Sequence, residues 1–99
     1  MKKKFAFLLM GSDFDPEKHR AEFETDGCVS IIQTVRDFDD AKAAAVRLYR
    51  DGVGVMELCG AFDEAMADEL AALTDHKVGI GYVINNPSMD PLFARFFGE

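Results

Sequence analysis

The chain has 99 residues and a mass of 11.0 kDa, which suits one compact domain spanning residues 1–99. Apolar residues make up 48% of it and charged residues 29%, a composition that excludes a disordered or low-complexity chain. The formal net charge of −7 opposes binding to nucleic acid phosphates or to anionic lipid, because both require clustered Lys and Arg. We therefore expect no nucleic-acid partner and no membrane partner.

The N-terminal segment has a basic head, residues 2–4, followed by an apolar run, residues 5–10. A secretory signal needs about 7–15 apolar residues, so this shorter run is interpreted as a buried β-strand. The two cysteines, Cys28 and Cys59, are too few for a disulfide framework. We expect a cytoplasmic protein with reduced thiols.

The next part of the chain predicts a short helix, a strand and a long helix. Pro16 suits the first turn of a helix over residues 16–24, although that segment has few apolar residues. β-Branched residues predict a strand over 28–35, and its extra polar residues suggest a sheet edge. Apolar residues at helical spacing then predict a helix between the N-cap Asp37 and Gly52. Four charged residues lie outside its apolar face: Asp39, Lys42, Arg47 and Arg50.

The second half predicts a strand over residues 53–59, a helix over 62–73 and a strand over 78–84. Gly79 and Gly81 fall on one face of the last strand, where they would let a bulky group approach the backbone. An aromatic helix should follow the cap Asp90 and Pro91. It contains Leu92 and three phenylalanines, and we expect the phenylalanines to pack over the glycine face: Phe93, Phe96 and Phe97.

Alternating strands and helices predict an α/β fold with a four-stranded, mainly parallel sheet. The most apolar strands should be central, which gives the order 28–35, 5–10, 53–59, 78–84 and resembles half of a flavodoxin-like sheet with helices on both faces. A ferredoxin-like α+β fold is the main alternative. It would require antiparallel pairs, whereas the connections here are long and helical.

Ligands of open parallel sheets bind outside the carboxyl ends of the strands. The residues that this topology places there are mostly polar: Asp13, His19, Arg20, Arg36, Glu57, Cys59, Gly60 and Asn85. The two arginines suit an anionic group, and Gly60 precedes a helix N-terminus whose free amides can also hold an anion. We therefore predict a site for a small anionic metabolite.

Glu57 and Cys59 also allow a catalytic interpretation. A carboxylate in an apolar central strand could act as a general acid or base, and a thiol before a helix could act as a nucleophile with His19 nearby. Asp13, Asp15 and His19 match no standard metal-ligand spacing, so no metal site is expected. The phosphate-binding glycine motifs of nucleotide sites are lacking, so no cofactor is expected.

Four segments of the chain resemble a family of small bacterial proteins known only as a domain of unknown function. They read FAFLLMGSDFDPEKHRAEFET, TVRDFDDA, GVGVMELCGAF and GYVINNPSMDPLFARFFG, and together they span most of the sequence. The resemblance implies a cytoplasmic prokaryotic protein. It implies no activity, cofactor or site residue.

Three functional hypotheses follow. The first is a small-molecule binding protein that forms a homo-oligomer, since a four-stranded sheet leaves two edges and apolar surface to cover. The second is an enzyme that uses Glu57 and Cys59. The third is a structural or regulatory interaction module, which an exposed patch of Phe93, Phe96 and Phe97 would support.

Overall fold

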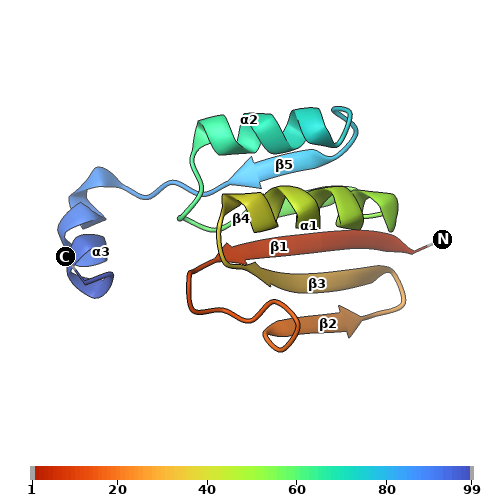
Figure 1. The fold of residues 1–99 in the computed structure, drawn as a ribbon, viewed down its shortest axis with the longest axis horizontal. Helices are drawn as coiled ribbons and strands as arrows, with labels where there is room; N and C mark the ends of the chain where they lie inside the picture. The colour runs from red at the N-terminus through yellow and green to blue at the C-terminus, as the bar shows by residue number, and fades with distance from the viewer. Residues whose placement is uncertain (1, 99) are drawn as a thin grey trace.

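The computed structural model describes residues 2–98 as one five-stranded mixed sheet with helices (Figure 1). The sheet order is β2-β3-β1-β4-β5. The strands are β1 (Lys3–Met10), β2 (Arg20–Glu24), β3 (Cys28–Val35), β4 (Val55–Leu58) and β5 (Gly79–Tyr82). The helices are α1 (Phe38–Arg50), α2 (Glu64–Leu73), the 3₁₀ turn η1 (Pro87–Met89) and α3 (Asp90–Phe96).

The predicted α/β class and the order of the four main strands are confirmed. β1 pairs in parallel with β3 on one side and with β4 on the other, and β4 pairs in parallel with β5. The ferredoxin-like alternative, which needs antiparallel neighbours at these positions, does not agree with these pairings. The carboxyl ends of β1, β3, β4 and β5 therefore meet at one edge of the sheet.

The helix predicted over residues 16–24 is wrong, because this segment forms a turn and then β2. β2 pairs antiparallel with β3, so the sheet has five strands and β3 is not at its edge. The sequence of β2, Arg-Ala-Glu-Phe-Glu, alternates charged and apolar residues, as an exposed edge strand does. Pro16 begins a turn here rather than a helix.

The expectation of helices on both faces is also wrong, because α1 and α2 pack against each other over one face. Right-handed crossovers that run in the same direction along a sheet put their helices on the same face, and β3-α1-β4 and β4-α2-β5 do so. The β1-to-β3 connection, which could carry a helix over the other face, contains β2 instead.

The hydrophobic core lies entirely between these two helices and one face of the sheet. Its strand residues include Ala6, Leu8, Ile31, Met56 and Leu58, which alternate with residues that point the other way. We call the second side the open face. It carries the partly buried or exposed residues Phe5, Phe7, Leu9, Ile32, Val55 and Glu57 together with Gly79 and Gly81.

The C-terminal tail, residues 83–98, does not pack over the glycine face, which corrects the prediction made from its aromatic residues. α3 packs against η1 and stands away from the sheet beyond its carboxyl end (Figure 1). The space above Gly81 is occupied instead by Glu57. A Cβ atom at Gly81 would lie 2.7 Å from Glu57 Oε1.

Candidate functional site

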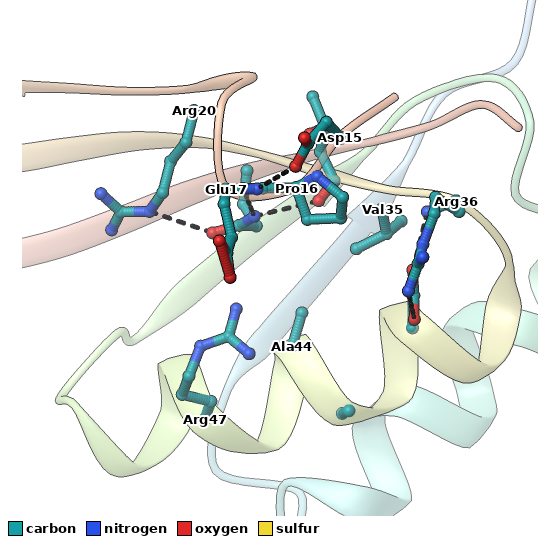
Figure 2. A pocket seen from close by; sticks show the side chains of 12 residues that line it. Asp15, Pro16, Glu17, Arg20, Val35, Arg36, Ala44 and Arg47 are labelled. Carbon is teal, nitrogen blue, oxygen red and sulfur yellow. Dashed lines mark hydrogen bonds and ion pairs between the residues drawn. The ribbon is translucent and has the colours of Figure 1, made fainter. Parts of the chain in front are cut away.

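A cavity of about 700 Å³ lies on the helix-covered side of the sheet, beside the carboxyl end of β3. One wall is the turn of residues 15–20, the second is the end of β3, and the third is α1 (Figure 2). The volume falls within the range of about 300–1,000 Å³ that is usual for small-molecule sites.

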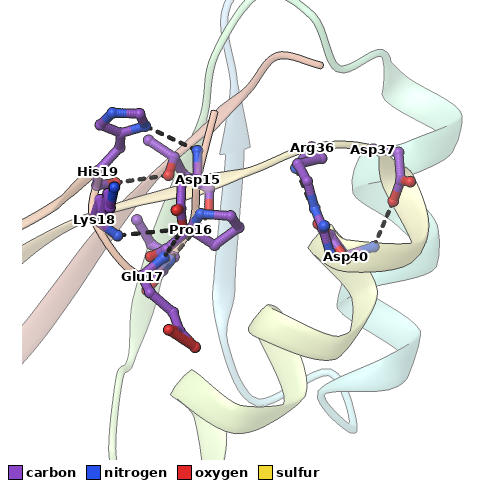
Figure 3. Close-up of polar contacts among 10 residues, drawn as sticks. Asp15, Pro16, Glu17, Lys18, His19, Arg36, Asp37 and Asp40 are labelled. Atoms are coloured by element: carbon purple, nitrogen blue, oxygen red, sulfur yellow. Dashed lines mark hydrogen bonds and ion pairs between the residues drawn. The ribbon is translucent and has the colours of Figure 1, made fainter. Parts of the chain in front are cut away.

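The turn that forms the first wall is fixed by its own polar groups (Figure 3). The carboxylate of Asp15 accepts a hydrogen bond from the Glu17 amide at 3.0 Å, and the Asp15 amide donates to Nδ1 of His19 at 2.8 Å. The His19 ring also packs edge-on against Phe14. These contacts use His19 to shape the turn and place Glu17 at the cavity.

Two buried polar side chains of β3 tie this turn to the sheet. Gln33 is 2% exposed; its Nε2 donates to the Pro16 carbonyl at 3.3 Å, and its Oε1 accepts from Nε of Arg20 at 3.0 Å. The Thr34 hydroxyl donates to the His19 carbonyl at 2.6 Å. Because buried polar groups are costly unless they are paired, these bonds hold the wall in one position.

An ion pair closes the end of the cavity nearest the start of α1. Nε of Arg36 donates to Oδ2 of Asp40 at 2.7 Å, and its terminal NH2 donates to Oδ1 at 3.2 Å (Figure 3). These hydrogen bonds lower the pKa of Asp40 and raise the pKa of Arg36. The positive charge of Arg36 is therefore largely balanced by Asp40.

The other two arginines of the cavity differ in how their charge is balanced. Arg20 pairs with Glu22 at 3.1 Å in addition to its bond to Gln33. Arg47 extends from α1 toward the turn, where the Glu17 side chain faces it across the cavity (Figure 2). Within residues 2–98 Arg47 forms no ion pair, so it is the cation of this cavity that is available to a ligand.

Of the residues that the sequence predicts at the carboxyl ends of the strands, two line the cavity together: Arg20 and Arg36. Asp13 and His19 lie in the same loop but do not line the cavity. Gly60 lies apart from it, with Val83 near its backbone. Asn85 belongs to the tail, where its Nδ2 donates to Oδ1 of Asp90 at 2.8 Å.

Glu57 and Cys59 also lie outside the cavity. Glu57 lies on the open face above Gly81, and no ion pair to it is found within residues 2–98. Cys59 is partly buried against the core, and its sulfur accepts a weak hydrogen bond from the Met10 amide at 3.4 Å. The structure therefore does not bring the two candidate catalytic residues together with Arg20 and Arg36.

The cavity also has lining residues that the sequence pattern did not indicate: Arg47, Gln33 and Glu17. Arg47 lies outside the apolar face of α1, and helical periodicity alone predicts that such a residue is exposed to solvent. Gln33 and Thr34 had a usable signal. Two consecutive polar residues in a strand point to opposite faces, so one of the two side chains must point toward the core, where it needs partners.

No three His, Cys, Asp or Glu side chains within residues 2–98 gather closely enough to hold a metal ion. In the same range, no helix has both the length and the apolar character that crossing a membrane requires.

Comparison with known proteins gives one match. No curated protein and no solved structure matches the chain. A family model described as a family of unknown function, DUF6506, matches residues 3–98, nearly the whole sequence. The chain therefore belongs to this family of unknown function, DUF6506.

Proposed function

We propose that this protein binds a small anionic metabolite in the cavity between α1, the turn of residues 15–20 and the end of β3. The observation that carries the proposal is Arg47, whose guanidinium faces a cavity of suitable size without an ion pair in the described chain. A guanidinium binds carboxylate and phosphate oxygens through paired hydrogen bonds.

The neighbouring charges restrict what the ligand can be. Arg36 is engaged by Asp40 and Arg20 by Glu22 and Gln33, so a single anionic group would be anchored mainly by Arg47. Glu17 and Asp15 add negative charge to the opposite wall. A ligand with several negative charges would be repelled there, which favours a compact monoanion such as a small monocarboxylate.

The enzyme alternative has less support. It depends on Glu57 and Cys59, which lie outside the cavity, and Cys59 is partly buried against the core. A carboxylate and a thiol that do not meet at a ligand-sized cavity have no common place at which to act on a substrate. We therefore base the proposed function on binding.

The test is a thermal-shift titration with inorganic phosphate, acetate and succinate on the wild type, on Arg47→Gln and on Arg50→Gln. A ligand that binds only the folded state stabilises it, and the stabilisation grows with the ratio of the ligand concentration to the dissociation constant. Losing one charged hydrogen-bond donor should weaken binding by roughly 10- to 100-fold. We expect acetate, which carries a single charge, to stabilise the wild type more than succinate does, and not to stabilise Arg47→Gln.

Arg50→Gln is the matched control, because Arg50 lies one turn further along α1 and does not line this cavity. It should respond to the anions as the wild type does. Equal stabilisation of the wild type and Arg47→Gln, or no response of the wild type to any of the anions, would contradict the proposal.

A further inference from the structure

Glu17 is a second residue of the cavity whose charge is not balanced. Its side chain extends from the turn of residues 15–20 toward Arg47 on α1 (Figure 2). The hydrogen bond that Glu17 donates to Asp15 comes from its backbone amide, so its carboxylate is not used by the turn. In the part of the chain that the structure describes, neither Glu17 nor Arg47 forms an ion pair. An anion and a cation therefore face each other across the cavity.

The other charged groups that line the cavity are engaged by the protein itself. The carboxylate of Asp15 accepts hydrogen bonds from two backbone amides of its own turn, at 3.0 and 3.4 Å. Arg36 is paired with Asp40, and Arg20 is held by neighbouring side chains of the sheet. The two facing charges on the turn and on α1 are thus the pair that is left for a ligand.

The charges of the whole lining also cancel. Three arginines and three acidic residues line the cavity. A plain anion bound at Arg47 would be attracted by the guanidinium but repelled by the carboxylate of Glu17 on the opposite wall. A ligand that carries one negative and one positive group would be attracted by both walls, and its net charge of zero matches that of the lining.

Apolar side chains make up the rest of the cavity surface. They are Pro16, Val35, Ala43 and Ala44. Val35 and Ala44 are 1% and 2% exposed, so they are fixed by the packing of α1 on β3 and form a rigid apolar floor. Such a floor suits a hydrocarbon group of a few carbon atoms held between polar anchors.

We propose that the ligand of this cavity is a zwitterion, namely a small amino acid whose carboxylate binds Arg47 and whose ammonium group binds Glu17. Its hydrocarbon part lies against Val35 and Ala44. The inference rests on the proposed function, because this carboxylate is the anionic group that Arg47 holds there. It adds a second, positive group to the ligand and gives Glu17 a role in binding it. A carboxylate side chain accepts the N–H groups of an ammonium ion in charge-assisted hydrogen bonds.

The test is isothermal titration calorimetry with pairs of ligands that differ only in the amino group. Glycine is compared with acetate, L-alanine and β-alanine with propionate, and 4-aminobutyrate with butyrate. The three types of amino acid place their charged groups at increasing separation, so the series also measures the span between the two walls. We expect at least one amino acid to bind the wild type roughly tenfold more tightly than its carboxylate partner, because the ammonium group adds a charge-assisted hydrogen bond.

Glu17→Gln tests the assigned role directly, since glutamine keeps the shape of the side chain and removes its charge. The dissociation constant of the amino acid should rise about tenfold, whereas that of the matching carboxylate should stay the same or fall. Asp13→Asn is the matched control, because Asp13 is exposed in the same loop and does not line the cavity. It should bind both ligands as the wild type does. Glu17 and Asp13 are exposed and lie outside the core, so both variants should keep the circular dichroism spectrum of the wild type.

The inference and the proposed function fail in different ways. Carboxylates that bind the wild type as tightly as every amino acid, but do not bind Arg47→Gln, would overturn the zwitterion and leave the anion site in place. If neither class of ligand binds the wild type, both are wrong. If Glu17 only blocks Arg47 by pairing with it, Glu17→Gln would tighten the binding of both classes in the same proportion, and that result would also overturn the inference.

Discussion

Gln33 is the residue that most directly links the sequence of β3 to the form of the cavity. Its amide bonds to the turn, to its own strand and to Arg20, so one side chain sets the separation of two cavity walls. Two hydrogen bonds between Arg36 and Asp40 close the end of the cavity nearest the start of α1. The cavity is thus defined by polar contacts of single residues, and these can be tested one at a time.

The ion pair of Arg36 and Asp40 makes a prediction about pH. Hydrogen bonding by Arg36 lowers the pKa of Asp40 from its ordinary value of 3.8. A lowered pKa in the folded state means that the carboxylate stabilises the fold above its unfolded pKa, and that this contribution is lost as the pH falls through the folded pKa. Carboxyl NMR titration of Arg36→Met should show the Asp40 midpoint moving up toward 3.8.

Arg50→Met serves as the control for this titration, since Arg50 is not a partner of Asp40. The Asp40 midpoint should be the same in that variant as in the wild type. If the Asp40 carboxyl titrates at the same pH in the wild type and in Arg36→Met, then Arg36 has no electrostatic effect on Asp40.

At the scale of elements, both long helices begin at an aspartate that caps them. The Asp37 side chain accepts from the Asp40 amide and the Asp63 side chain from the Met66 amide, each at 2.8 Å. Both caps have extended backbone angles. They fix where α1 and α2 start, and for α1 the cap therefore also helps to place Asp40 beside Arg36.

Replacing a cap should destabilise the protein measurably. Asp63→Ala removes the bond to the Met66 amide, and we expect the free energy of unfolding in urea to fall by about 1 kcal/mol. Asp68→Ala is the matched control, because Asp68 is exposed inside the same helix and alanine is a good helix former. If both variants lose the same free energy of unfolding, the capping role of Asp63 is contradicted.

Some elements could be predicted from the sequence and others could not, for physical reasons. The apolar run of β1 and the helical spacing within α1 are long patterns with one structural solution, and both were confirmed. β2 has only five residues, so its alternation is brief, and Pro16 nearby favours a helix start equally well. Whether such a short edge segment forms a strand depends on its pairing with β3 more than on its own sequence.

The candidate site was predictable only in part for a related reason. Topology placed Arg20 and Arg36 near the carboxyl ends of the strands, and both line the cavity. Arg47 lies far from them along the chain, and only the packing of α1 beside β3 brings it near. The aromatic pattern of the tail indicated burial, but a sequence pattern does not specify which surface buries it.

At the scale of the whole molecule, the cavity and the open face lie on different sides of one sheet. The cavity lies on the helix-covered side and the open face lies on the other, so variants at Arg47 and at Glu57 should act separately. The radius of gyration, 14.0 Å, slightly exceeds the value of about 13 Å usual for this length, as expected for a chain with a projecting tail.

The most direct measurement is an NMR titration with acetate that follows the side-chain Nε–Hε signals of the arginines. The proposed site predicts that the Arg47 signal moves until the site is saturated, while the signal of Arg50, which does not line the cavity, stays in place. An Arg47 signal that stays in place throughout the titration would contradict the proposed site.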